Sequence, residues 1–569
     1  MTGRMSFSSS TSINVMADLI SSSTSVNVVR PTRKSLDVQS CRESDKVQND
    51  LSAKKKGVFI DEAISKTKFG LFNYVMIFLS GLILNAVLME TCGMAFVIPV
   101  SQCDMKLSAS EKGILGAVSF FGIICSSHLW GFLADTKGRR CVIQPTLFVA
   151  FLLSVTSSFV QNFYLFVALR FLNGFFISGS SATVFAYLGE FHNNEQRSRA
   201  IMGSAVIYGI SCLLLPLIAW FVINQDWQFH VPLIDITYKP WRLFIIVCGI
   251  PGFLASMILL FMPESPKFVL GQGNEVEAYK VLQTMNRWNN GKKNKVESFE
   301  IYEEAESIEN RRRITDCKNS RFPLLKSVWI QTAPLFKPPH LSSTLLICTI
   351  QFGIYATSNG FYMFFAEVLN RMATNLGSFT EQRMAMCDII NMKPANMSAN
   401  QLNEHDDVKC ITKLELATLE QGIVLEFLFA LGFAVIGLII NKVGKFPILF
   451  VILIVSGSGG ILCMNTDIPV VQIYSFIALM CAGIAVNIVN SATVELYPTA
   501  LRAMAICISL MFGRMGCVFG SFTAALLLDN HCEAAFYLSG VSVIVMGVLT
   551  YFIPNIHNKA DNSIVQNES

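Results

Sequence analysis

Twelve long apolar runs most constrain what this chain can fold into. Each is close to or longer than the roughly 20 residues that an α-helix needs to cross a hydrocarbon layer about 30 Å thick. Hydrophobic residues make up 52% of the chain and charged residues only 15%, so a soluble domain could not cover its apolar surface. The sequence therefore predicts an all-α membrane protein with twelve transmembrane helices. The runs lie at 72–99, 114–134, 141–161, 165–187, 201–224, 243–262, 344–366, 419–440, 446–464, 470–493, 503–528 and 535–553.

Charges between the runs predict the orientation in the membrane. Loops after odd-numbered runs are short or acidic, whereas loops after even-numbered runs are basic, which is the positive-inside pattern. Both termini are therefore expected in the cytosol. The net charge of +4 is small and follows the side of the membrane, so it does not indicate a nucleic-acid partner. The basic residues are Lys137, Arg139, Arg140, Arg197, Arg199, Lys442, Lys445 and Arg502.

The segments outside the runs divide the chain into domains. Residues 1–69 are rich in Ser, Thr, Lys and Asp and contain no run long enough for a signal peptide, so we expect a disordered cytosolic tail. Residues 263–343 are charged, and the helical period of EVEAYKVLQTMNRW predicts short amphipathic helices on the cytosolic face. Two six-helix halves at 70–262 and 344–555 remain, followed by a cytosolic tail at 556–569.

One predicted outer loop is long, at 367–418 between the seventh and eighth runs. Asn396 begins an Asn-Met-Ser acceptor for N-glycosylation, which is used only on a luminal or extracellular face. Cys387 and Cys410 share this loop and are candidates for a disulfide in an oxidising compartment. Most other cysteines lie within the runs, where they are expected to pack as small apolar side chains.

A short charged stretch, GFLADTKGRR at 131–140, follows the second run directly. A weaker copy follows the eighth run at 437–445, about 306 residues later, with glycines at the same two positions and a basic residue after the second. A single match of this kind could arise by chance.

A second pair of matches occurs at nearly the same offset. Glu190 precedes Arg197 by seven residues after the fourth run, and Glu495 precedes Arg502 by seven after the tenth, about 305 residues later. Two matches at one offset indicate two six-helix halves related by duplication. In transporters built in this way the substrate site lies between the halves, near the middle of the membrane.

These motifs resemble a known family. GFLADTKGRR is similar to the signature loop of the major facilitator superfamily, and PESPKF at 263–268 is similar to its sugar-porter and organic-ion branches. The resemblance covers residues 70–555 and implies the major facilitator fold. VFAYLGEF at 184–191, WQFH and PWRLFIIVCGIP at 227–251, and TVELYP at 493–498 resemble the synaptic vesicle glycoprotein 2 family within it.

The resemblance implies a cytosolic latch between the halves. Gly131 and Gly138 would permit a tight turn and close approach, while Asp135 would face the amides at the start of a neighbouring helix, with the eleventh helix as partner. Glu190 with Arg197, and Glu495 with Arg502, would form an adjoining charge network. The alternative is that these are ordinary topology charges. The predicted latch comprises Gly131, Asp135, Gly138, Arg139, Arg140, Glu190, Arg197, Glu495 and Arg502.

Ionisable groups inside membrane spans are costly and are candidates for function. Glu90 is expected to carry a proton as the site alternates, and relatives have an acid there, although their second acid is replaced by Val87. A static ion pair of Glu90 with Arg170 is the alternative. Glu426 is a further candidate, unless it lies near a span end and faces water.

Aromatic side chains are expected to line part of the solute path, because their faces hold apolar rings or organic cations. The resemblance assigns this role to Tyr208, Trp220 and Phe364; lipid-facing packing is the alternative for each. The predicted substrate or coupling path comprises Glu90, Arg170, Tyr208, Trp220, Phe364, Asn490 and Arg514.

Two classes of function remain. The sequence has no Walker loop, no HExxH, no CxxC pair and no metal-ligand spacing of histidines, so we expect neither an enzyme nor a cofactor. We favour a secondary active transporter of a small organic solute that works by alternating access, with proton coupling as one form. The alternative is a non-transporting vesicle glycoprotein that acts in trafficking through cytosolic partners. Either would reside in the plasma membrane or an intracellular vesicle membrane.

Overall fold

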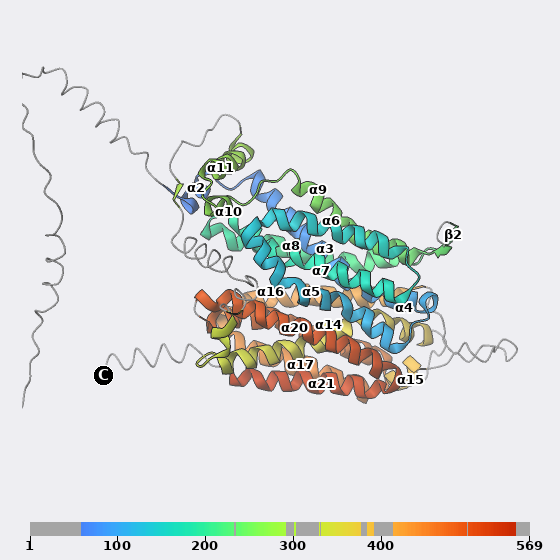
Figure 1. Ribbon diagram of the computed structural model, residues 1–569. Coiled ribbons are helices and arrows are strands. Elements are labelled where there is room, and N and C mark those ends of the chain that lie inside the picture. The colour runs from blue at the N-terminus through green and yellow to red at the C-terminus, as the bar shows by residue number, and fades with distance from the viewer. Residues whose placement is uncertain are drawn as a thin grey trace, which may run out of the picture. The chain divides into compact units, whose positions relative to one another are not determined.

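The computed structural model describes residues 58–232, 235–291, 301–302, 329, 332–376, 384–391, 413–497 and 499–553. Within them, twelve helical segments are long and apolar enough to cross a membrane, so the prediction of twelve spans is confirmed. The protein is a multi-pass membrane protein made almost wholly of helices (Figure 1).

Each half contributes six spans. The first half contains α3 (Leu71–Cys92) continued by α4 (Met94–Met105), α5 (Ala109–Lys137), α6 (Arg139–Ser158), α7 (Phe163–Glu190), α8 (Asn194–Ile223) and α9 (Pro240–Leu259). The second half contains α14 (Leu341–Leu376), α16 (Leu416–Val443), α17 (Lys445–Asn465), α18 (Pro469–Met480) continued through η2 (Cys481–Ile484) by α19 (Ala485–Leu496), α20 (Thr499–Asn530) and α21 (Cys532–Leu549), which ends in η3 (Thr550–Phe552).

Local signals in the sequence set where the helices begin and end. Ser108 accepts a hydrogen bond from the amide of Glu111 and begins α5 with a capping box. Gly138 ends α5 with φ of +113°, and Gly444 ends α16 with φ of +91°. Left-handed φ values favour glycine, so the repeated glycine in the two halves corresponds to the same turn in both.

A small layer covers one end of the helical bundle, which we name the α11 end. It consists of α2 (Ile60–Lys66), α10 (Pro266–Gly271) and α11 (Glu275–Asn290), with strand β1 (Val58–Phe59) paired in parallel to β4 (Ile301–Tyr302). Figure 1 shows α2, α10 and α11 together at this end. The helix predicted around EVEAYKVLQTMNRW is confirmed as α11.

Ordered structure begins earlier than the sequence predicts. Residues 58–69 were expected in the disordered tail, yet Ile60 and Ile64 of α2 are buried. Asp61 forms an ion pair with Lys267, and Asn193 donates to the hydroxyl of Ser65 at 2.9 Å. The prediction is wrong for this short stretch, because a two-turn helix with only three apolar positions gives too weak a pattern to detect.

The opposite end, which we name the α15 end, carries α15 (Met386–Asn391) and a hairpin of β2 (Phe229–Val231) and β3 (Ile236–Tyr238). Between the two ends, α5 of the first half packs along α20 of the second (Figure 1).

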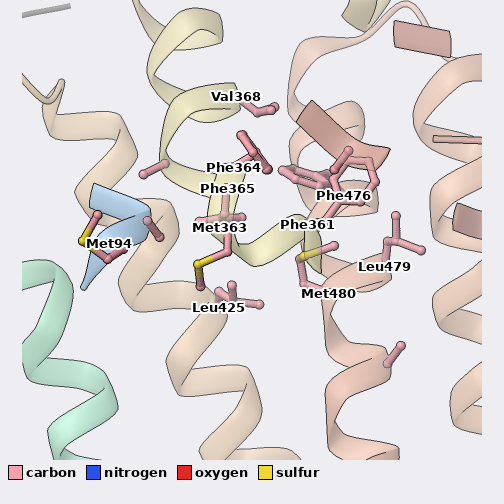
Figure 2. Close-up of a cluster of buried hydrophobic side chains, with 14 of the residues drawn as sticks. Met94, Phe361, Met363, Phe364, Phe365, Val368, Leu425, Phe476, Leu479 and Met480 are labelled. Carbon is pink, nitrogen blue, oxygen red and sulfur yellow. The ribbon is translucent and has the colours of Figure 1, made fainter. Parts of the chain in front are cut away.

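Apolar side chains from both halves pack together beside α14. Figure 2 shows Met94 of α4 close to Met363 of α14, and phenylalanines of α14 facing Phe476 of α18. Burial of these large side chains excludes water from this region. The labelled members of the cluster are Met94, Phe361, Met363, Phe364, Phe365, Val368, Leu425, Phe476, Leu479 and Met480.

Candidate functional site

The turn of GFLADTKGRR depends on one of its two glycines. A Cβ atom on Gly138 would lie 2.4 Å from Oε2 of Glu264, in addition to the unfavourable φ. Gly131 lies within α5, and a Cβ atom there would meet nothing within 4 Å. The expectation that close approach requires Gly131 is therefore wrong, and the requirement falls on Gly138 alone.

Glu264, not Asp135, caps the exposed amides at this turn. Its Oε1 accepts hydrogen bonds from the backbone N–H groups of Arg139 and Arg140, each at 3.0 Å, and its Oε2 accepts one from Cys141 at 3.2 Å. A carboxylate at a helix N-terminus is stabilised by these amides and by the helix dipole. The amides predicted as the partner of Asp135 are those of the eleventh helix, so that pairing stays a prediction.

Asp135 instead contacts Arg139, whose guanidinium lies 3.1 Å from the carboxylate one helical turn earlier. The Asp135 side chain is 53% exposed, and it belongs to α5, which packs along α20, the eleventh span. Among the described residues, no hydrogen bond joins Asp135 to α20. Its role as a latch stays a prediction.

The adjoining charge network differs from the predicted one. Arg139 donates from Nε to Oε1 of Glu190 at 3.0 Å, so Glu190 pairs with Arg139 and not with Arg197. Arg140 donates to the carbonyl oxygens of Leu259 and Leu260 at the end of α9, at 2.8 and 2.9 Å. The side chains of Glu495 and Arg502 lie outside the described residues.

Glu90 and Arg170 form a buried network inside the first half. Nη1 of Arg170 lies 3.4 Å from Oε2 of Glu90, and the Ser154 hydroxyl donates to both carboxylate oxygens at 2.6 and 2.7 Å. Nη2 of Arg170 donates to Ser157 at 2.5 Å. These contacts join α3, α6 and α7 and match the static ion pair that was the alternative. The proton-carrier role of Glu90 stays a prediction.

A second polar cluster lies between the halves, and we name it the inter-half cluster. Tyr362 of α14 donates its hydroxyl to Oε1 of Glu426 at 3.0 Å, and Glu426 is only 8% exposed. Tyr208 of α8 lies within electrostatic reach of Glu426. Glu426 is therefore buried in mid-span, and the alternative that it faces water at a span end is wrong.

Arg514 and Asn490 extend this cluster. Nη1 of Arg514 on α20 donates to the Ser127 hydroxyl on α5 at 3.0 Å, which joins the two halves. Gln351 of α14 donates to Oδ1 of Asn490 at 3.1 Å. Of the predicted path residues, the structure thus brings Tyr208 and Arg514 to the boundary between the halves, whereas the contact of Asn490 lies within the second half.

Two predicted aromatic residues lie elsewhere. Phe364 is 1% exposed inside the apolar cluster of Figure 2, and Trp220 near the end of α8 packs against the same core. Neither belongs to the inter-half cluster. Their surroundings are those of core packing, and a contact with solute at these positions stays a prediction.

A buried charge cluster at the α15 end is not among the residues that the sequence predicts for the site. Lys112 of α5 is 2% exposed, and its Nζ lies 2.8 Å from Glu367 of α14 and 3.3 Å from Asp529 of α20. Arg371 pairs with the same two carboxylates at 2.6 and 3.3 Å. The predicted runs started after Lys112 and stopped before Glu367, so both were read as loop residues. The spacing of Glu367 and Arg371, one helical turn apart, was the available signal.

The described disulfide joins Cys387 of α15 to Cys532 at the start of α21. The predicted pairing of Cys387 with Cys410 is wrong, and Cys410 itself lies outside the described residues, as does the glycosylation acceptor Asn396. Cys103 is disulfide-bonded as well. Across the described part of the chain, no group of three or more His, Cys, Asp or Glu side chains could hold a metal ion.

Twelve spans in two halves, with a matched turn after the second and eighth, define a transporter-type membrane protein of the major facilitator fold. A family model for "Sugar (and other) transporter" matches residues 67–375, more than half of the chain, and one for "Major Facilitator Superfamily" matches residues 416–567. The chain belongs to the sugar (and other) transporter family.

Curated relatives include synaptic vesicle glycoproteins, as the motifs predicted. Human synaptic vesicle glycoprotein 2B is 28% identical over 312 residues, which cover 53% of this chain and 46% of the relative. Rat synaptic vesicle glycoprotein 2A is 29% identical over 315 residues, covering 53% and 42%. The matched region thus covers less than half the length of each of these relatives.

Solved structures confirm the fold. The xylose transporter XylE from E. coli, in an inward-open conformation, has a TM-score of 0.57 at 15% identity, covering 84% of this chain and 95% of that one. A mutant of the nucleoside transporter NupG has a TM-score of 0.56 at 10% identity, covering 85% and 100%. At these identities the likeness shows the fold alone.

Proposed function

We propose that the protein is a secondary active transporter that moves a small organic solute by rocking its two halves around the inter-half cluster. The α11 end is cytosolic in this proposal, with both termini, because the basic loops lie there. The α15 end then faces the lumen or the exterior, where Asn396 can be glycosylated. The host membrane is that of an intracellular vesicle or the plasma membrane.

The observation that carries this proposal is the uneven distribution of bonds between the halves. Among the described residues, the ion pairs and hydrogen bonds found between the halves lie at the α15 end or in mid-span. Such an arrangement is expected of one of two alternating states, closed at the α15 end. The bonds are Lys112–Glu367, Lys112–Asp529, Asn224–Leu414, Lys413–Asp226 and Arg514–Ser127.

These bonds are few enough to be broken in each cycle. An equilibrium between two conformations is reversed by a difference of a few kcal/mol, which is the scale of a small set of ion pairs and hydrogen bonds. The apolar cluster of Figure 2 includes Met94 of the first half, and apolar contacts of this kind have no fixed geometry that would prevent the halves from rocking.

A second candidate is a non-transporting vesicle glycoprotein that acts through cytosolic trafficking partners. The likeness to synaptic vesicle glycoproteins 2A and 2B over 53% of the chain leaves it open. The burial of Glu90 against Arg170 favours it, because an acid held in a static pair does not couple transport to protons.

The test is untargeted mass spectrometry of small molecules accumulated by cells that express the wild type or Asp135→Asn at equal level. We expect the wild type to accumulate a solute and Asp135→Asn to accumulate much less. Asp467→Asn is the matched control, because Asp467 is an exposed carboxylate outside the latch. No accumulation by correctly sorted wild type would overturn the transport proposal and favour the second candidate.

A further inference from the structure

Glu426 is a buried carboxylate without a cationic partner. The Tyr362 hydroxyl donates to its Oε1, and no Lys, Arg or His side chain among the described residues forms an ion pair with it. Glu426 is 8% exposed, and its Oε2 forms no hydrogen bond with the described residues. A mid-span carboxylate is therefore held by one tyrosine hydroxyl and no cation.

Arg514, conversely, is a mid-span cation for which the described residues supply no acidic partner. Its Nη1 donates to the Ser127 hydroxyl, and no carboxylate in the described part of the chain pairs with it. Its other guanidinium nitrogens form no hydrogen bond with the described residues. A guanidinium offers five donors in a planar fork, so most of this group's binding capacity is unused.

Among the described residues, Glu426 and Arg514 lack the ion pairs that hold two other buried charged groups. Glu90 is paired with Arg170, and Lys112 with Glu367. An unpaired charge inside a membrane span costs several kcal/mol unless a partner is supplied. Two opposite charges that remain unpaired in the same region point to a partner that the chain itself does not provide.

Tyrosines connect the two charges. Tyr362 of α14 donates to Glu426, and two helical turns earlier on α14 the ring of Tyr355 lies against Gly513, the chain neighbour of Arg514. Tyr208 belongs to the first half, as does Ser127, whereas Glu426 and Arg514 belong to the second. A solute held here would touch both halves, as alternating access requires.

We propose that the solute is a zwitterion, whose cationic group pairs with Glu426 and whose carboxylate pairs with Arg514. The rings of Tyr208 and Tyr362 offer aromatic faces to the cationic group, and the guanidinium fork can bind a carboxylate through two hydrogen bonds. A neutral sugar would leave both protein charges unpaired. This inference rests on the proposed transport function and adds the class of solute to it.

The experiment uses the purified full-length protein in liposomes and four labelled probes. The zwitterion is γ-butyrobetaine. Its matched cation is butyltrimethylammonium, its matched anion has carbon in place of the quaternary nitrogen, and xylose is the neutral probe. We expect uptake of the zwitterion at least about tenfold above each of the others, because each charge-assisted contact contributes about that factor or more.

Two variants test the contacts of the zwitterion's cationic and anionic groups separately. Glu426→Gln should shift the preference toward the matched anion, and Arg514→Gln should shift it toward the matched cation, each by about tenfold relative to the zwitterion. A merely structural role would lower all uptake in parallel and shift no preference. Glu420→Gln, an exposed acid on the same helix, should leave the preferences unchanged.

Failure of this inference is distinguishable from failure of transport. Uptake of xylose or of a singly charged probe equal to that of the zwitterion would overturn the inference and leave transport standing. If none of the four probes is taken up, the solute found by untargeted mass spectrometry decides: a neutral or singly charged solute overturns the inference, and a zwitterion supports it. No accumulated solute at all overturns both proposals.

Discussion

Lys112 of α5 donates from Nζ to Oε1 of Glu367 on α14 at 2.8 Å, and this buried ion pair joins the two halves at the α15 end. Arg371 pairs with the same two carboxylates from within the second half, so removing Lys112 breaks the contact between the halves and leaves one negative charge uncompensated, at a cost of up to about 3 to 5 kcal/mol. Lys112→Met should therefore open the α15 end.

The opening can be measured as a distance between spin labels on Tyr164 and Val470, two exposed positions at the α15 end of opposite halves. Ketone-based labels leave the native cysteines intact. We expect a longer distance in Lys112→Met, and a partial return in Lys112→Met with Glu367→Gln. Lys280→Met is the control, since Lys280 pairs with Glu277 at the surface. An unchanged distance in Lys112→Met would show that this ion pair does not hold the halves together.

Gly138→Ala should destabilise the protein, whereas Gly131→Ala should not. At Gly138 an added Cβ would need the φ of +113° and would displace Glu264 from the amides that it caps. We expect a loss of about 1 to 3 kcal/mol. Gly131 is a helical position with open space around it, where alanine is favoured by about 0.5 to 1 kcal/mol. Thermal unfolding in detergent measures both, and equal melting temperatures would contradict the assignment.

Non-reducing proteolysis and mass spectrometry should recover the peptide of Cys387 linked to the peptide of Cys532. The bridge closes a segment of 145 residues, and its loss by Cys532→Ser should cost about 2 to 5 kcal/mol of stability. Cys125→Ser, at an exposed free cysteine, should change little. A peptide of Cys387 linked to Cys410 would restore the pairing predicted from the sequence and refute the observed one.

His192, in the loop between α7 and α8, should make the protein less stable in acid. It is fully buried, its Nδ1 donates to the carbonyl oxygen of Leu188 at 2.8 Å, and its Nε2 has no partner among the described residues. Burial lowers the pKa of His192 below the ordinary value of 6.5. The unfolded chain then binds a proton that the folded chain does not, so stability falls as the pH drops below about 6.5.

Melting temperatures across this pH range check the prediction. The decline should be smaller in His192→Gln than in the wild type, because the buried imidazole is gone. His230→Gln, at a histidine that is largely exposed, should keep the wild-type decline. A wild-type decline that His192→Gln leaves intact would assign the acid sensitivity to other groups.

The sequence predicts the fold well because the length of an apolar run is itself the physical requirement for a span. It predicts the ends of spans less well. Lys112 and Glu367 lie in helices that continue past the apolar runs, and a run is taken to end where a charge occurs. A buried charge is allowed there only because its partner comes from a helix more than 250 residues away along the chain, which no local pattern shows.

The contacts of the candidate site are also hard to predict from the sequence, for the same reason. The carboxylate that caps the amides at the start of α6, on Glu264, comes from beyond the sixth span, and no local spacing indicates it. Cys387 and Cys410 are close in sequence, yet Cys387 bonds to a residue 145 positions away. Residue types mark which groups are costly to bury, and only the packing of helices decides which groups meet.

The contacts at the GFLADTKGRR turn are reciprocal. Glu264, beyond the end of α9, neutralises the amides that begin α6, while Arg140 at the start of α6 neutralises the carbonyl groups that end α9. Each helix supplies the counter-charge for the other's dipole. Separating the two helices would expose the amides that begin α6 and the carbonyl groups that end α9 at once. We therefore expect α6 and α9 to move as one rigid unit when the halves move.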